Sequence, residues 1–266
     1  MRNIFLKYLL KAENRFKTVV SHEFSKLYGH NNYLKLENFQ STASADLTHI
    51  ARRERLDLTN PTDIAKAQRI SAEENISSIT ELFGDIQKEI SRQMSKHHNV
   101  VTHYMAEHGY IPLWVLVNVL TFGKITSFYR NMKDADKTIV ARQFGLQPKE
   151  LHKYMVNLGI ARNLCAHDER FFDIRFKKHI RTNSIRKFHL LHIPYVNSNC
   201  AYGTNDAYAV AIMLTQLLEK RDVCEFVSAM KTEFTKLASQ LHTIPHTIIM
   251  QRMGFGPNWM NLPSLK

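Results

Sequence analysis

The chain has 266 residues, is 44% apolar and contains only nine glycines and seven prolines. This composition excludes a disordered or collagen-like chain and disfavours a turn-rich β architecture. The net charge of +12 makes nucleic acid the first partner to consider, with an inert basic surface as the alternative. Three widely spaced cysteines argue against a disulfide framework or a zinc finger. The longest apolar run, 111–122, is too short to cross a bilayer, so a cytoplasmic protein without membrane contact is expected.

Residues 4–28 are predicted to form an amphipathic helix, because apolar residues recur there at three- and four-residue steps. Glu13, Arg15 and Lys17 are expected to lie mostly on the opposite side, facing water. A second helix is predicted to begin at NPTD, where Pro61 suits the first helical position, and to end near Met94.

Further helical patterns fill the rest of the chain. One strongly apolar helix is predicted from Pro112 to Met132, with Trp114 in the core. Others are predicted over 134–144, 148–169, 205–219 and 221–242. These patterns predict an all-α fold in a single domain, 1–266. Its expected parts are N-terminal helices (1–109), core helices (110–242) and a C-terminal tail packed on the core (243–266).

The stretch GIARNLCAHDER, residues 159–170, holds the most informative residues: Arg162, Asn163 and His167. The spacing alone decides little. With 16 arginines and 14 histidines, about one Arg-x4-His pair is expected by chance, and Arg92/His97 is a second example.

On a helix, Asn163 and His167 share a face, the long Arg162 side chain reaches the same rim, and Arg170 is expected one turn beyond. A guanidinium, an amide and an imidazole together suit RNA cleavage without a metal, since they can stabilise charge, position groups and move protons. Cys165 is expected to point away and to pack. The alternative is an ordinary helix end, where Arg and His favour the terminal carbonyls.

Several longer segments resemble the Abi-like family of bacteriophage-resistance proteins, the AbiD/AbiF group. They are IPLWVLVNVLTFGKITSFYRNM (111–132), ARQFGL (141–146), LGIARNLCAHDERFF (158–172), the N-terminal 6–29 and MGFGPNW (253–259). The resemblance covers most of the chain and keeps the order of the segments. Members of that family carry several tens of residues before the segment that begins here at about Leu6.

The resemblance implies a HEPN-like helical bundle with additional flanking helices, because the family belongs to the HEPN superfamily. That superfamily's R-N-x3-H motif falls on Arg162, Asn163 and His167. It implies a metal-independent endoribonuclease of a bacterial phage-defence system, with no cofactor, and a site formed where two motifs meet across a homodimer. His167 is then the general acid or base, Arg162 the charge stabiliser and Asn163 the positioning residue.

The segment 171–192 follows the motif and mixes basic with aromatic residues, which is typical of single-stranded RNA binding. We expect Phe171 and Phe172 to be buried and the basic side chains to face RNA; a solvated basic loop is the equal alternative. The residues expected to bind RNA are Arg170, Arg175, Lys177, Lys178, Arg181, Arg186 and Lys187.

Other hypotheses stay open. His97, His98, His103 and His108 with Glu107 lack a second ligand pair at metal spacing, so a surface role is expected and no metal site. The rival to the nuclease is a non-cleaving protein that holds a small structured RNA, and a weaker rival is a structural dimerisation domain. The charge supports both RNA hypotheses equally.

Overall fold

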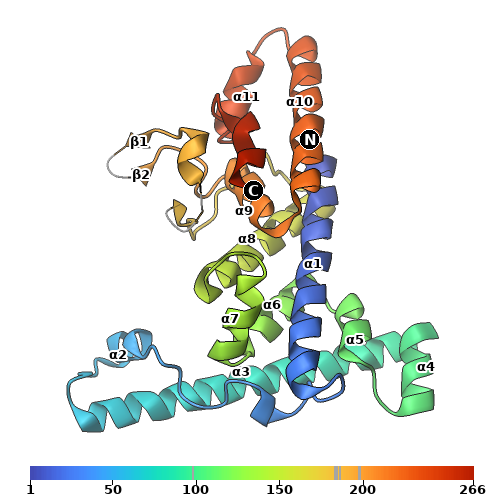
Figure 1. Cartoon of the computed structure of the whole chain (residues 1–266), viewed down its shortest axis with the longest axis vertical. Helices are drawn as coiled ribbons and strands as arrows, with labels where there is room; N and C mark the ends of the chain where they lie inside the picture. The colour runs from blue at the N-terminus through green and yellow to red at the C-terminus, as the bar shows by residue number, and fades with distance from the viewer. Residues whose placement is uncertain (98, 183–184, 186, 197–198) are drawn as a thin grey trace. The chain divides into compact units, whose positions relative to one another are not determined.

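The computed structural model describes residues 1–97, 99–182, 185, 187–196 and 199–266. The described chain is mostly helical with very little strand, which confirms the all-α prediction (Figure 1). Within it, the only strands are β1 (Tyr195–Val196) and β2 (Asn199–Cys200), which pair antiparallel. Contacts divide the chain into two compact units. The terminal unit comprises Met1–Phe16 and Ala141–Lys266, and the central unit is Lys17–Val140. The predicted single domain and its internal boundaries stay a prediction.

The central unit is organised around one long helix, α3 (Pro61–Ser95). As predicted, Pro61 occupies the first turn, and the Asn60 side chain caps the helix by accepting a hydrogen bond from the Thr62 N–H at 2.9 Å. Figure 1 shows α2 beside the first half of α3, whereas α4 and α5 lie near the other end of α3. The elements of this unit are part of α1 (Arg2–Tyr28), η1 (Leu36–Asn38), α2 (Thr48–Glu54), α3, α4 (Asn99–His108), α5 (Leu113–Val119), α6 (Phe122–Asn131) and most of α7 (Asp134–Arg142).

Three phenylalanines join separate elements in the central core. The ring of Phe24 lies 5.3 Å from Phe39 and 5.0 Å from Phe128, and the latter two are 5.2 Å apart. The apolar helix predicted from Pro112 to Met132 is instead two helices, because Thr121 caps α6 by accepting from the Lys124 N–H. Trp114 on the short α5 is 49% exposed, so the prediction of a core position for it is wrong.

The terminal unit is built around α9 (Ala207–Leu217), in which every residue is buried. A helix that is apolar on all sides must be covered on all sides, and this explains its central place. Asp206 caps α9 by accepting a hydrogen bond from the Ala209 N–H (2.9 Å), and it also accepts one from the Gly203 N–H in the preceding turn (2.8 Å). The other helices here are part of α1, α8 (Pro148–Ala166), η3 (Phe188–Leu191), α10 (Lys220–Gln240), α11 (His246–Arg252) and η4 (Trp259–Leu265).

The C-terminal segment packs within the terminal unit through aromatic side chains. Phe255 lies 4.9 Å from Tyr208 on α9 and 5.3 Å from Phe234 on α10, and Trp259 lies 5.4 Å from Phe234. Among the described residues, no helix combines the length and apolar character needed to traverse a bilayer.

The contact between the tail and the α9 cap can be tested at Gly254. Its φ is +82°, and an added Cβ would lie 2.2 Å from the Asp206 carboxylate. We expect Gly254→Ala to lower the free energy of unfolding by about 2 kcal/mol, through backbone strain and a displaced cap. The matched control is Gly84→Ala in α3, where nothing lies within 4 Å of an added Cβ. That change should stabilise the protein by about 1 kcal/mol. Urea titrations that show equal effects for the two variants would refute the argument.

Candidate functional site

The end of α8 places the Arg-Asn-His residues. Arg162 and Asn163 lie on its last turn, and His167 is the C-cap. The helix ends earlier than the predicted residue 169, because Asp168 adopts the left-handed conformation with φ of 59°. Aspartate tolerates this conformation better than most residues, and the Glu169 N–H then bonds the Leu164 carbonyl at 3.0 Å. Asp168 also pairs with Arg2, so the turn that follows His167 is fixed.

Arg162 contacts one exposed and one buried partner. Its Nη1 donates to Asn163 Oδ1 at 3.3 Å, and its Nε lies 3.5 Å from Glu13 Oε2. The Glu13 side chain is only 5% exposed, whereas that of Arg162 is 31% exposed. Asn163 and His167 are exposed. The guanidinium is therefore anchored from the interior while the amide and imidazole remain open to a ligand.

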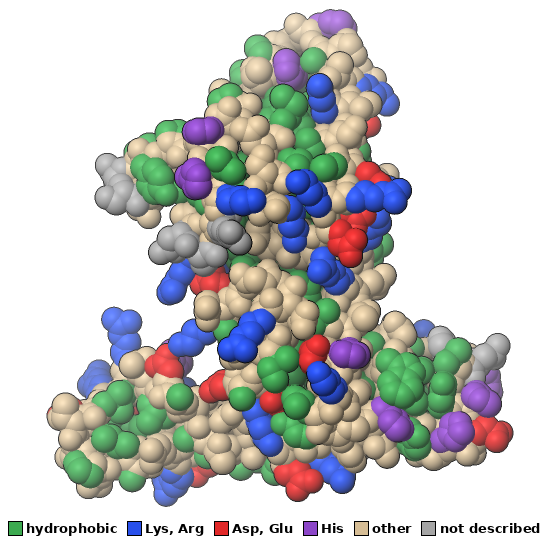
Figure 2. Space-filling view, in the orientation of Figure 1, with side chains coloured by type: hydrophobic (Ala, Val, Ile, Leu, Met, Phe, Trp, Pro, Cys, Tyr) green, Lys and Arg blue, Asp and Glu red, His purple; other side chains and the backbone are tan. Residues whose placement is uncertain are grey.

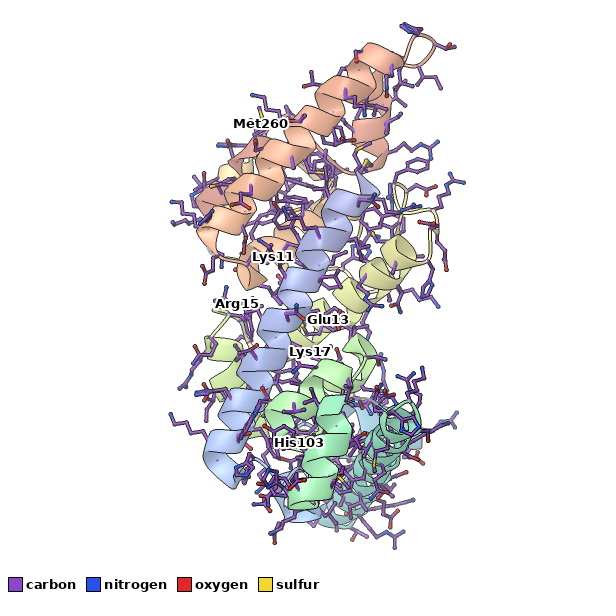
Figure 3. All side chains as sticks on the ribbon, turned by 90° about the vertical axis from the view of Figure 1, so that its right-hand side faces the viewer. Lys11, Glu13, Arg15, Lys17, His103 and Met260 are labelled. Atoms are coloured by element: carbon purple, nitrogen blue, oxygen red, sulfur yellow. The ribbon has the colours of Figure 1, made fainter. Side chains whose placement is uncertain are left out.

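Helix α1 brings Glu13 to this place. On one side of α1, Lys11 pairs with Asp222 at 2.5 Å and the Arg15 Nη1 donates to the Leu217 carbonyl at 2.8 Å. Figure 3 shows Lys11 and Arg15 leaving the helix on one side and Glu13 on the other. Polar contacts to the start of α10 and the end of α9 thus fix the rotation that directs Glu13 toward Arg162.

The burial of Glu13 corrects the sequence-based expectation that Glu13 and Lys17 lie on the water-facing side. Both are buried, with exposures of 4% and 7%. A signal for Glu13 exists in the sequence, because it follows Leu9 by four residues and precedes Val20 by seven, and so shares their stripe. An acidic residue on an apolar stripe indicates a buried partner.

Cys165 packs as predicted. It is 2% exposed, and burial raises the pKa of its thiol to about 11. A thiol with so high a pKa is a poor nucleophile at neutral pH, so Cys165 belongs to the core and not to the chemistry.

Two details after the helix differ from expectation. Arg170 does not continue the α8 face, because the chain has already turned; it pairs with Asp173 at 2.6 Å and lies 4.9 Å from the Phe172 ring. Phe171 is buried against Phe5, as predicted, but Phe172 is 38% exposed, so its predicted burial is wrong. Arg170 and Phe172 together form an exposed cation–aromatic pair.

The basic segment after the motif runs back along α8. The Asn157 side chain donates to the Lys178 carbonyl at 3.0 Å, and Arg181 Nε lies 3.5 Å from Glu150 near the start of the helix. Arg175 is held by protein carbonyls, since it donates to Ile174 and to Arg252. Arg186 lies outside the described residues. The basic side chains that are exposed in this segment are Arg170, Arg175, Lys177, Lys178, Arg181 and Lys187.

The wider surface adds two observations. Figure 2 shows Lys and Arg side chains in several small groups on the face drawn there, with Asp and Glu side chains beside some of them. Within the described part of the chain, no three His, Cys, Asp or Glu side chains are arranged to hold a metal ion. His103 and His108 are exposed, with ring centroids 6.2 Å apart.

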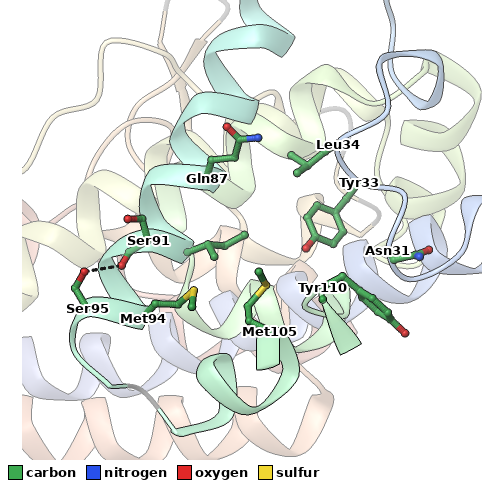
Figure 4. Close-up of a pocket in the computed structure, with 11 residues that line it drawn as sticks. Asn31, Tyr33, Leu34, Gln87, Ser91, Met94, Ser95, Met105 and Tyr110 are labelled. Atoms are coloured by element: carbon green, nitrogen blue, oxygen red, sulfur yellow. Dashed lines mark hydrogen bonds between the residues drawn. The ribbon is translucent and has the colours of Figure 1, made fainter. Parts of the chain in front are cut away.

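A separate pocket of about 550 Å³ lies in the central unit, between α3, the end of α4 and the residues after α1. Figure 4 shows Tyr33, Met94 and Met105 facing this space. None of its described lining residues is charged, so it is poorly suited to a phosphate backbone. The Arg-Asn-His cluster and the basic segment belong to the terminal unit alone.

Fold and site together define an all-α protein with an exposed Arg-Asn-His cluster at a helix end, followed by a basic segment. The family model described as "Abi-like protein" matches residues 1–173, and the chain belongs to this family. Membership supports a role in abortive infection, a form of resistance to bacteriophage. The search of curated proteins and the search of solved structures gave no match.

The cysteines offer a direct check of the geometry at the end of α8. Cys224 is exposed, whereas Cys165 is buried with its pKa raised to about 11. At pH 8 the thiolate fraction of Cys165 is therefore small, and we expect iodoacetamide to modify Cys224 first and Cys165 only after denaturation. Peptide mass spectrometry over time measures both rates. Rapid modification of Cys165 in the folded protein would contradict its packing.

Proposed function

We propose that this protein is a metal-independent endoribonuclease that acts in abortive infection. The observation that carries the proposal is the exposed His167, which caps the helix that presents Arg162 and Asn163, with Arg162 anchored on buried Glu13. An imidazole, a guanidinium and an amide on one accessible helix end supply the groups that phosphodiester cleavage requires.

In the proposed reaction, the ribose 2′-oxygen attacks the adjacent phosphorus and the bond from phosphorus to the 5′-oxygen breaks. The products are a 2′,3′-cyclic phosphate and a 5′-hydroxyl. His167 accepts the 2′-hydroxyl proton or donates one to the leaving 5′-oxygen, because an imidazole changes charge near neutral pH. Arg162 stabilises the negative charge that grows on the phosphoryl oxygens, and Asn163 orients the scissile group.

The two proton transfers support a homodimer as part of the proposal. One imidazole in the site serves one transfer, and a second copy of the chain would bring its own His167 for the other. This is the arrangement of the HEPN superfamily, whose R-N-x3-H motif matches Arg162, Asn163 and His167. Closed two-fold symmetry places identical residues of two copies on opposite sides of one axis.

The basic segment supports RNA as the substrate. Lys177 and Lys178 are exposed and belong to the basic segment that follows the motif, and each phosphate that such side chains neutralise makes binding salt-dependent. The same charges favour the second candidate, a protein that holds a small structured RNA without cleaving it. Cleavage is what distinguishes the two.

The second Arg-x4-His pair, Arg92 and His97, provides the control for catalysis. We expect His167→Ala to lower the cleavage rate of single-stranded RNA by at least ~100-fold, since general acid–base catalysis contributes ~10²–10⁴-fold. His97→Ala should leave the rate unchanged, because its partner Arg92 pairs with the buried Glu89 at 2.5 Å and carries no asparagine beside it. Gel analysis of labelled RNA measures both rates, and equal losses would overturn the assignment.

Removal of metal ions by a chelator and measurement of RNA binding distinguish the nuclease from the protein that only binds RNA. We expect wild-type cleavage to be unchanged in EDTA and the new ends to carry 2′,3′-cyclic phosphates, detected by mass spectrometry. Loss of cleavage on chelation would refute the metal-independent mechanism. Salt-dependent RNA binding by the wild type without any cleavage would instead establish the binding-only candidate.

Glu13 is expected to act as a positioning residue. Glu13→Gln keeps the shape but removes the buried charge beside Arg162. Because small misplacements of a catalytic group cost up to ~100-fold, we expect kcat to fall by 10- to 100-fold with little change in KM. The control is Glu225→Gln, which alters an exposed pair with Arg221. A higher KM with unchanged kcat would show that Glu13 does not act through Arg162.

A further inference from the structure

A second pocket in the terminal unit lies at the other end of α8 from His167. Its volume is about 820 Å³, and its walls come from the basic segment and from the β1–β2 pair. They include His179, Arg181 and Thr182 on one side and Tyr195, Asn199 and Cys200 on the other. This volume is within the range of small-ligand sites and is ample for one nucleotide.

The imidazole of His179 is fixed by two hydrogen bonds. Its Nδ1 lies 3.0 Å from Thr204 Oγ1, and the Asn205 amide nitrogen lies 3.2 Å from Nε2. Both ring nitrogens are used, so His179 offers a ligand the face of its ring and not a hydrogen bond.

Tyr195 adds an exposed aromatic side chain. It is 64% exposed at the start of β1, although large aromatic side chains are normally covered. Exposed aromatic rings in basic surroundings are what single-stranded nucleic acids use for base stacking. The Thr182 hydroxyl, which accepts a hydrogen bond from the Cys200 thiol at 3.8 Å, lines the same pocket.

Arg181 supplies the charge. Its side chain is 73% exposed, and buried Glu150 holds the Nε edge at 3.5 Å. None of the lining residues that the structure describes is acidic. An arginine that stays mostly exposed at a pocket whose described lining is not acidic favours a phosphate.

We propose that this pocket binds one nucleotide of a single-stranded RNA, with the base on Tyr195 and the phosphate on Arg181. The proposal rests on the proposed function, because it makes the pocket a remote subsite of the same substrate. Glu150 precedes His167 by 17 residues on α8, so the two sites are about 26 Å apart along the helix axis. A strand that fills both sites contains about eight nucleotides at a stacked rise of ~3.4 Å.

Cys200 provides a readout that does not depend on cleavage. It lines the pocket, whereas Cys224 is exposed on α10 and serves as an internal control. A 2′-O-methyl RNA of 16 nucleotides cannot be cleaved by 2′-oxygen attack. We expect it to slow alkylation of Cys200 by N-ethylmaleimide at least fivefold while Cys224 reacts unchanged. A mixture of the four nucleoside monophosphates at the same nucleotide concentration should protect much less.

Substitutions test the two contacts separately. We expect Tyr195→Ala and Arg181→Ala each to weaken binding of the 16-nucleotide RNA about tenfold, as loss of one stacked base or one phosphate contact does. The matched controls are Val196→Ala, next to Tyr195 and 58% exposed, and Arg221→Ala, an exposed arginine on α10. All four sites are on the surface, so folding should persist.

The outcomes distinguish the subsite from the nuclease. Wild-type cleavage without protection of Cys200 overturns the subsite and leaves the nuclease standing. Protection of Cys200 by RNA in a protein that cleaves nothing supports the subsite and counts against the nuclease. Full protection by the monophosphates assigns the pocket to a free nucleotide and overturns the proposal. Losses of RNA affinity in Val196→Ala and Arg221→Ala that equal those in Tyr195→Ala and Arg181→Ala overturn it as well.

Discussion

The buried carboxylate of Glu13 is the constraint on which the site depends. A charge in an apolar interior is tolerated when a partner neutralises it, and Arg162 lies beside it at 3.5 Å. Breaking such a pair leaves an uncompensated charge, so α1 and α8 are held in one register. Arg162 thereby loses the conformational freedom of a surface arginine, and its remaining nitrogens lie beside Asn163 at an exposed helix end.

Arginines in this unit divide into those used by the fold and those presented outward. Arg15 and Arg175 donate to main-chain carbonyls at the ends of α9 and α11, and so satisfy groups that the helices leave open. Arg170 and Arg181 keep most of their surface in water while one carboxylate orients each of them. A net charge counts both kinds alike, although only the second kind is available to a polyanion.

The sequence was sufficient for the helical class and for most helix positions, because three- and four-residue apolar spacing and the Pro61 and Pro148 starts are local signals. The apolar pattern predicted the wrong helix length where a local break interrupts a long apolar run, as at Thr121. The pattern also predicted burial for Trp114, which is exposed. The Arg-Asn-His residues could be selected from one segment. The stripe around Glu13 indicates a buried partner, but it does not identify Arg162, which lies about 150 residues away in the chain. The residues of the second pocket come from the basic segment and from the β1–β2 pair, which lie apart in the chain, and they carry no spacing pattern.

The terminal unit is discontinuous, because residues 17–140 are inserted between its two parts. During translation, α1 is made before α8, since the partner of Glu13 is encoded 149 residues later. At ~5–20 residues per second this interval is on the order of 10 s. A nascent chain therefore carries Glu13 without its partner for about this interval, and the ion pair that orients Arg162 can form only after α8 has been made.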